Sequence, residues 1–260
     1  MKIAVVTGAS SGMGQEFVKQ ISKTYRVLDE IWVIGRSIEK LSRLQKSVMG
    51  KVRILPMDLT AQESKERLHQ ILKTEKPHIK LLINCAGAGK LGGFSELSQR
   101  DQEMCVQLNC EALMAVTHLC LPYMHPRARI VQMASAAAFV PQPGFAVYAA
   151  SKAYVLSFSR ALREELRERE ITVTAVCPGS VDTPFFDDQR YPVPDYKRKV
   201  MAKPEKVVRK AIRDAAKGRE LSVYGGSMKA FQILCRLLPH TVIIRIAGKL
   251  WKLYEKGEVK

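Results

Sequence analysis

The chain of 260 residues is long enough for one large α/β domain or two small domains, and its hydrophobic content of 47% is ample for a core. No apolar run reaches the roughly 18 to 20 residues of a membrane-spanning helix. Its formal net charge of +17 favours negatively charged partners such as an acidic surface, a phosphorylated ligand, an anionic substrate or nucleic acid; the alternative is a basic solvated face. Lysine and arginine are spread along the chain and no known binding module is recognisable, so we expect no nucleic-acid partner.

Short apolar runs alternate with helical patterns along most of the chain. Strands are predicted at 3–7, 31–35, 53–57, 81–85, 129–134, 171–176 and 221–225. Several are apolar without alternation, which is typical of strands covered on both faces. Helices are predicted between them, for example at 14–25, 37–48 and 64–74. This alternation predicts a single α/β domain with a Rossmann-like, doubly wound parallel sheet of about seven strands.

Three glycines, Gly8, Gly12 and Gly14, stand where the first strand turns into the first helix. At such a turn the backbone can approach a ligand closely, and the free N–H groups of the helix start attract a phosphate. The spacing is T-G-x-x-x-G-x-G rather than the common G-x-G-x-x-G. The alternative is a glycine-rich turn without a ligand.

Further motifs follow in order along the chain. They are NCAG at 84–87, Asn109 in a helical stretch, Ser135 after the fifth strand, YAASK at 148–152 and PGSVDTP at 178–184. With the glycine turn, this ordered set resembles the short-chain dehydrogenase/reductase family over residues 1–225, including its hydroxysteroid dehydrogenases and 3-oxoacyl reductases. The resemblance implies a nicotinamide-dependent oxidoreductase.

The chemistry of such an enzyme explains the catalytic candidates. Hydride transfer to a ketone leaves an alkoxide that needs a proton, and the reverse reaction needs a base. Tyr148, with a free pKa of about 10, is a poor base alone, but Lys152 lies on the same helix face, where its cation would stabilise the phenolate. Ser135 would hydrogen-bond the substrate oxygen. By the family pattern, Asn109 would hold a water that relays protons between Lys152 and solvent.

The resemblance also implies a set of cofactor contacts, although Cys85 departs from the more common N-N-A-G motif. The glycine turn would hold the phosphates, the segment after the third strand the adenine, NCAG the ribose and PGSVDTP the nicotinamide, with Thr183 as a hydroxyl donor. The implied residues are Gly8, Ser10, Ser11, Gly12, Met13, Gly14, Arg36, Ser37, Asp58, Leu59, Asn84, Ala86, Gly87, Tyr148, Lys152, Pro178, Gly179, Val181 and Thr183.

The end of the second strand favours NADP(H) over NAD(H). Enzymes that use NAD usually carry an acid there to bond the ribose hydroxyls. This chain has Gly35, Arg36 and Ser37 instead, so no carboxylate repels a 2′-phosphate, and Arg36 can pair with one. The alternative is that Arg36 is a solvated loop residue.

The segment 185–205, rich in aromatic, proline and basic residues, is interpreted as a lid over an apolar cleft, with a variable surface loop as the alternative. Phe185, Phe186 and Tyr191 are the candidate substrate contacts. We expect a ketone and a secondary alcohol of a lipophilic compound to be interconverted: a hydroxysteroid, bile acids included, or alternatively a long-chain 3-oxoacyl thioester. A catalytically silent NADP-binding regulator is disfavoured because all four catalytic positions are intact.

Residues 1–226 are predicted to form the dinucleotide-binding and catalytic domain, and residues 227–260 a helical extension broken at Pro239. A basic stripe is formed by Arg245, Lys249, Lys252 and Lys256. A basic amphipathic helix can lie on an anionic membrane, which makes peripheral membrane contact one outcome. The favoured alternative docks the apolar face on the enzyme body or a second subunit.

The six cysteines form no C-x-x-C pair and the five histidines do not cluster with them. We therefore expect reduced thiols in a cytoplasmic protein and no metal site. The family resemblance implies a homodimer or homotetramer.

Overall fold

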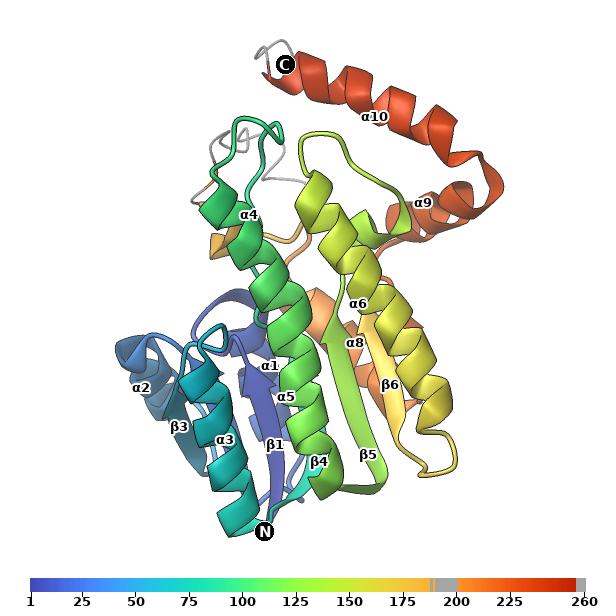
Figure 1. Cartoon of the computed structure of the whole chain (residues 1–260). Coiled ribbons are helices and arrows are strands. Elements are labelled where there is room, and N and C mark those ends of the chain that lie inside the picture. Colours follow the sequence, from blue (N-terminus) through green and yellow to red (C-terminus); the bar gives the residue numbers. More distant parts are fainter. Residues whose placement is uncertain (188, 190–200, 256–260) are drawn as a thin grey trace.

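The computed structural model describes residues 1–187, 189 and 201–255, which form strands and helices in alternation (Figure 1). The strands are β1 Lys2–Thr7, β2 Glu30–Gly35, β3 Val52–Pro56, β4 His78–Asn84, β5 Met124–Met133, β6 Thr172–Val176 and β7 Leu221–Ser222. The helices are α1 Gly12–Thr24, α2 Ile38–Ser47, α3 Gln62–Glu75, α4 Gln99–Val106, α5 Leu113–Cys120, α6 Ala146–Glu165, α8 Pro204–Ala216, α9 Gly226–Leu237 and α10 His240–Glu255.

The strands form one seven-stranded sheet in the order β3-β2-β1-β4-β5-β6-β7, and every pair is parallel. The predicted doubly wound, Rossmann-like fold is therefore confirmed. The strands β2 and β3 are added on one side of β1, and the strands β4 to β7 are added on the other side. In such sheets ligands bind outside the carboxyl ends of the strands at this switch point.

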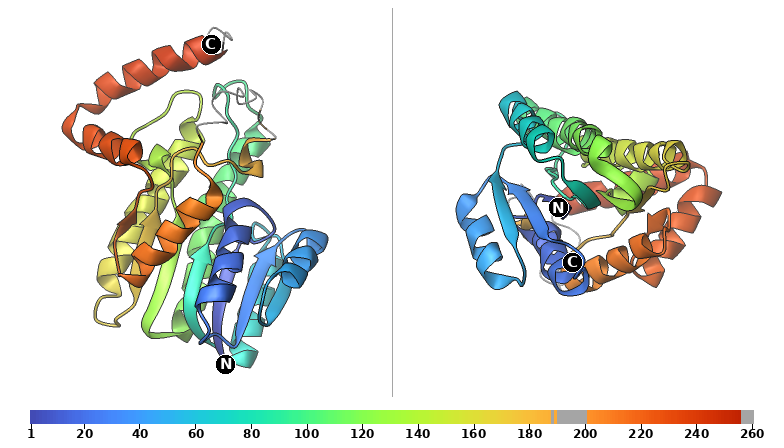
Figure 2. Two further views of the ribbon diagram at one scale, coloured as in Figure 1. Left: turned by 180° about the vertical axis from the view of Figure 1, so that it is seen from behind. Right: turned by 90° about the horizontal axis from the view of Figure 1, so that it is seen from below.

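Alternating side chains of the strands supply a core on each face of the sheet. In β1, Ile3 and Val5 pack with α3, α5 and α6, whereas Ala4 and Val6 pack with α1, α2 and α8. The left view of Figure 2, taken from behind, shows the second group of helices in front of the sheet. Because both faces are covered, the strands are apolar on both sides, as the uninterrupted apolar runs of the sequence predict.

The seventh strand is shorter than the predicted 221–225. Its last paired residue is Ser222, which lies opposite Val176 at the end of β6. The neighbouring strand β6 itself ends at Val176, and the last hydrogen bond between the two chains runs from the Cys177 N–H to the Ser222 carbonyl. Pairing therefore stops after two residues.

One helical run, Gln99–Tyr123, is long and apolar enough to cross a membrane by length and composition alone. It includes α4, a π-helical segment Gln107–Ala112 and α5. Ala112, Val116 and Cys120 pack in the core against the sheet. The run therefore covers one face of the sheet.

The helices α9 and α10 lie at the carboxyl ends of the strands, opposite the N-terminus (Figures 1 and 2). Cys235 of α9 and Ile243 of α10 form a small buried cluster with Val140. Further along α10, Trp251 lies against Gly144, where an added Cβ would come within 2.2 Å of the indole ring. Both helices thus pack on loops that follow β5.

Candidate active site

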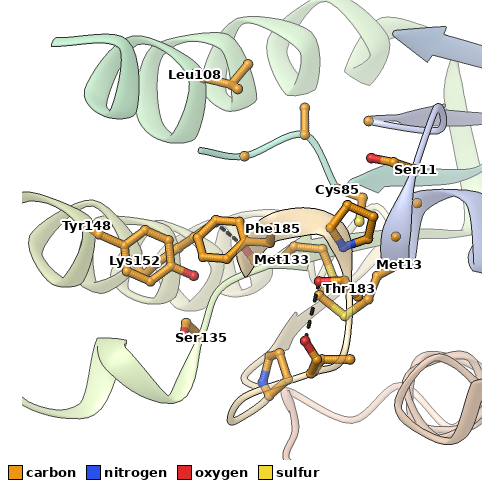
Figure 3. A pocket seen from close by; sticks show the side chains of 18 of the residues that line it. Ser11, Met13, Cys85, Leu108, Met133, Ser135, Tyr148, Lys152, Thr183 and Phe185 are labelled. Carbon is orange, nitrogen blue, oxygen red and sulfur yellow. Dashed lines mark hydrogen bonds between the residues drawn. The ribbon is translucent and has the colours of Figure 1, made fainter. Parts of the chain in front are cut away.

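A cavity of about 640 Å³ lies at the carboxyl ends of the strands (Figure 3). It brings together residues that are far apart in the sequence, from the turn after β1 to α9. The predicted cofactor and catalytic residues on its wall are Gly8, Ser10, Ser11, Gly12, Met13, Gly14, Arg36, Asp58, Leu59, Ala86, Gly87, Ser135, Tyr148, Lys152, Pro178, Gly179, Val181 and Thr183. The predicted substrate contacts Phe185 and Phe186 also line it, while Tyr191 lies outside the described residues.

The turn between β1 and α1 depends on glycine at each of its three positions. Gly8 and Gly12 have φ of 65° and 52°, which side chains rarely adopt. A Cβ on Gly8 would lie 2.6 Å from the amide nitrogen of Ala86, and one on Gly14 would lie 2.2 Å from the carbonyl oxygen of Gly8. The first turn of α1 lines the cavity, and the dipole of a helix favours an anion at its N-terminus.

Arg36 follows β2 at the edge of the same cavity and is exposed. Asp58, from the loop after β3, accepts hydrogen bonds from Thr60 through both its backbone N–H and its hydroxyl, at 3.0 and 2.7 Å. Partial burial opposes ionisation of Asp58, but these bonds and the charge of Arg36 outweigh it, so the pKa of the carboxyl is lowered. Asp58 is thus a stable carboxylate beside a cation.

Ser37, which was predicted to contact the cofactor, is not among the residues that line the cavity. Its hydroxyl accepts a hydrogen bond from the Lys40 N–H at 3.3 Å and caps α2. A serine directly before a helix is a preferred N-cap, and this signal was available in the sequence.

Asn84 lies behind the cavity wall. Its Nδ2 donates to Thr117 Oγ1 at 2.9 Å and to Gln132 Oε1 at 3.0 Å, which ties β4 to α5 and β5. The side chain shares the face of Leu82, because successive residues of a strand point to opposite sides. In this structure Asn84 acts as a scaffold residue.

Tyr148, on α6, projects into the cavity beside Ser135, which follows β5 (Figure 3). Its ring stacks on Phe145 with centroids 4.1 Å apart. Desolvation in the cavity raises the pKa of Tyr148 to about 12, although a hydrogen bond with Ser135 acts in the opposite direction. The phenol is therefore protonated at neutral pH and adjacent to a second hydroxyl.

Lys152 is buried one helical turn further along α6. Its Nζ donates to the Met133 carbonyl at 2.8 Å and lies 5.6 Å from the centroid of the Tyr148 ring. Burial lowers the pKa of Lys152. The amine lies close to the face of the Tyr148 ring.

Asn109 lies in the π-helical segment, a feature that is common at functional sites. Its Oδ1 accepts from the Ala88 N–H at 2.9 Å, and its Nδ2 donates to the Ala88 carbonyl at 2.8 Å and to Ser151 Oγ at 2.9 Å. A Cβ on Gly87 would lie 3.1 Å from Asn109 Oδ1 and 3.3 Å from Lys152 Nζ. Both groups therefore border the space beside Gly87.

Further residues of the wall, mainly apolar, were not named as site residues from the sequence. They come from separate segments that only the fold brings together, and among them are Leu91, Met104, Leu108, Gln142, Phe145, Met201, Met228 and Phe231. Met228 and Phe231 belong to α9, which packs on the P-G motif so closely that a Cβ on Gly179 would lie 2.6 Å from Met228 Sδ. In the sequence, this contact is indicated by the three-residue spacing of Met228 and Phe231, which places both side chains on one face of a helix.

The fold and the cavity define a doubly wound α/β protein with a dinucleotide-type glycine turn and a Ser-Tyr-Lys cluster. The sequence profile described as short chain dehydrogenase matches residues 2–192. The chain belongs to the short-chain dehydrogenase family and is an oxidoreductase that acts on CH–OH groups.

Several relatives are similar over most of the chain. Oxidoreductase UcpA of Salmonella typhimurium is 30% identical over 214 residues, which cover 80% of each chain. Nodulation protein G of a Rhizobium species is 30% identical over 186 residues, 71% of this chain and 75% of the relative.

Solved structures show the same fold. A serine dehydrogenase complexed with NADP+ has a TM-score of 0.76 and 26% identity, covering 85% of this chain and 94% of its own. A short-chain dehydrogenase/reductase from Burkholderia phymatum in complex with NAD has a TM-score of 0.78 at 22% identity, covering 90% and 92%. Relatives of this fold therefore occur with either dinucleotide.

Proposed function

We propose that this protein is an NADP(H)-dependent oxidoreductase that interconverts a ketone and a secondary alcohol of a lipophilic substrate. The observation that carries the proposal is the paired hydroxyls of Tyr148 and Ser135 in a cavity whose adjoining wall is apolar. The glycine turn and the N-terminus of α1 at the other end of this cavity would hold the cofactor phosphates.

The residues of the cluster have complementary roles in the proposed reaction. When bound, the nicotinamide would supply or accept the hydride. Ser135 would hold the substrate oxygen, and Tyr148 would donate its proton to the developing alkoxide or remove it from the alcohol. Lys152 and Asn109 border the space beside Gly87, where a water would pass the proton toward solvent.

The preference for NADP(H) rests on Arg36. It lies at the cavity edge after β2, where its guanidinium would pair with a 2′-phosphate. The neighbouring residues Gly35 and Ser37 carry no charge, and Ser37 is committed to capping α2. The NADP+ bound to the serine dehydrogenase relative is compatible with this proposal.

A hydroxysteroid, bile acids included, is the favoured substrate. The rings of Phe145 and Phe185 both lie close to that of Tyr148, with centroids 4.1 and 5.5 Å from the centroid of the tyrosine. Flat, rigid rings beside the proton donor suit a rigid polycyclic ligand. The second candidate, a long-chain 3-oxoacyl thioester, is favoured by the methionines and leucines of the same wall, which adapt to a flexible chain.

Turnover of NADPH and NADP+ with a panel of steroids, bile acids, acyl thioesters and small carbonyl compounds tests the function. We expect activity with a lipophilic ketone, and Tyr148→Phe should reduce it about 10²- to 10⁴-fold because the proton donor is lost. Phenylalanine keeps the stacking on Phe145, so cofactor affinity measured by calorimetry should persist. Cofactor binding without turnover on any substrate would instead favour the silent regulator.

We also propose a cytoplasmic homodimer or homotetramer. Val106 of α4, Met114 of α5 and Tyr154 of α6 are about 40% exposed and would be covered in an assembly. All six cysteines, each within the described residues, are free thiols, which suits a reducing compartment. Light scattering measures the assembly directly, and a monomer at micromolar concentration would contradict it.

A further inference from the structure

The helices α9 and α10 each have two apolar faces. The inner face of α9 contains Met228, Phe231 and Cys235, at spacings of three and four residues. The inner face of α10 contains Ile243 and Trp251, which pack on the loops after β5. These contacts attach the two helices to the enzyme.

The outer faces expose large aliphatic side chains to solvent. The exposed fractions are 58% for Ile233, 46% for Leu234, 76% for Leu237, 39% for Leu238, 44% for Val242, 54% for Ile246, 58% for Leu250 and 42% for Leu253. With about 100° per residue, 233, 234 and 237 form one stripe on α9, and 242, 246, 250 and 253 form one stripe on α10. We call these eight side chains the outer aliphatic face.

Basic side chains flank the outer aliphatic face. Arg245, Lys249 and Lys252 form an exposed stripe on α10, between its inner face and its aliphatic stripe. Lys229 and Arg236 have the same position on α9, whereas Lys256 of the predicted stripe lies outside the described residues. No aspartate or glutamate occurs in the sequence from 226 to 254. The surface is therefore both apolar and cationic.

We propose that α9 and α10 rest on an anionic lipid bilayer, with the outer aliphatic face in the acyl boundary and the basic side chains among the headgroups. Helices of this kind lie in the plane of a membrane interface, and their binding increases with apolar area and with attraction to anionic lipid. A second copy of the chain is disfavoured as occupant, because two such cationic surfaces would repel each other.

The bilayer would then lie one helix away from the candidate active site. Met228 and Phe231, on the inner face of α9, line the catalytic cavity. A second, apolar cavity of about 490 Å³ lies beneath the start of α10, against His240 and Ile244, and shares Gln142 with the first. If the proposed function holds, a lipophilic substrate could enter the cavity directly from the bilayer. Membrane binding itself does not depend on the proposed function.

Co-sedimentation of the full chain with vesicles tests the proposal. One set contains phosphatidylcholine alone, the other phosphatidylcholine with phosphatidylserine, each at low and high salt. We expect binding to the anionic vesicles that is weakened by salt, since the basic side chains are exposed. The absence of binding to anionic vesicles at low salt would overturn the proposal.

Two pairs of variants separate this surface from the overall positive charge. Leu237→Glu with Leu250→Glu should weaken binding at least about tenfold, whereas Val27→Glu with Met49→Glu, equally exposed elsewhere, should not. Lys249→Glu with Lys252→Glu should act like the first pair, and Lys23→Glu with Lys46→Glu, on α1 and α2, should have a smaller effect. Equal losses in test and control pairs would show attraction to the whole basic protein and refute the proposal.

Retained turnover and circular dichroism exclude misfolding of the variants. Light scattering of the wild type and of the double variant Leu237→Glu with Leu250→Glu tests whether a second copy of the chain covers the outer aliphatic face instead. An assembly that this variant alone dissociates would show that a second copy covers the face and would overturn the proposal.

Discussion

The Nζ of Lys152 donates a hydrogen bond to the backbone carbonyl of Met133 over 2.8 Å. This bond connects α6 to the end of β5, two residues before Ser135, so the lysine and the serine are held by the same short segment. One helical turn before Lys152, the phenol of Tyr148 is buried in the cavity, and this desolvation raises its pKa.

The raised pKa of Tyr148 predicts opposite pH dependence for the two directions. The protonated phenol donates in reduction and is abundant at neutral pH, whereas oxidation needs the phenolate, which increases with pH. The positive charge of oxidised nicotinamide should lower the pKa of Tyr148 from about 12, but not reverse this order. We expect kcat/KM for alcohol oxidation to rise from pH 7 into the alkaline range while ketone reduction does not. Oxidation that slows with increasing pH would contradict the assignment of Tyr148 as the base.

Arg36→Ala should reduce the preference for NADP(H) over NAD(H) about ten- to a hundredfold. A charge-assisted bond to the 2′-phosphate contributes roughly 1.5 to 3 kcal/mol, and NAD(H) lacks that phosphate. Arg43→Ala is the matched control, because Arg43 is also exposed nearby but pairs with Glu39 on α2. The ratio of kcat/KM for the two cofactors is the measurement. An unchanged ratio in Arg36→Ala would mean that another group selects the cofactor.

Phe231→Ala should raise KM for bulky lipophilic substrates about ten- to a hundredfold and change KM for small ketones little. The half-buried ring lines the catalytic cavity from α9, and a bulky substrate that covered it would gain roughly 1.5 to 3 kcal/mol of apolar contact. Ile233→Ala, on the outer face of the same helix, is the control and should leave both KM values unchanged in detergent-free solution. Equal KM values for Phe231→Ala and wild type would show that α9 does not contact the substrate.

Gly144→Ala should destabilise the protein more than Gly50→Ala. Both glycines have positive φ, 74° and 84°, so each substitution costs roughly 1 to 2 kcal/mol in backbone strain. At Gly144 the new Cβ would also meet the Trp251 ring, whereas no described atom lies within 4 Å at Gly50. The difference in Tm between the two variants measures the collision with α10. Equal Tm values would indicate that Trp251 moves aside freely.

The sheet and the cofactor end of the cavity were predictable because both depend on local patterns. The uninterrupted apolar strands require a covered parallel sheet, and the turn at Gly8 needs backbone conformations and close approaches that only glycine permits. Spacing likewise placed Lys152 one turn after Tyr148 on α6.

The remaining features depend on tertiary neighbours that a motif does not specify. Asn84 follows the cofactor motif pattern, yet its side chain points to Thr117 because of its position in the strand alternation. The amine of Lys152 is oriented by its hydrogen bond to the Met133 carbonyl. The face of α10 that is buried is the one whose side chains pack on Val140 and Gly144, and the remaining face is exposed. Sequence periodicity identifies apolar positions on α10 but does not divide them between two faces.

The contact between Trp251 and Gly144 gives the protein an intrinsic optical reporter. The chain has two tryptophans, and Trp32 is fully buried in the sheet, where Arg53 lies 4.8 Å from its ring centroid. Trp251 is half-buried on α10, against the loop whose Phe145 stacks on Tyr148. We therefore expect the fluorescence emission of Trp251 to report whether α10 is packed on this loop, while Trp32 supplies a constant background from the core. The packing of this helix could then be followed without any added label.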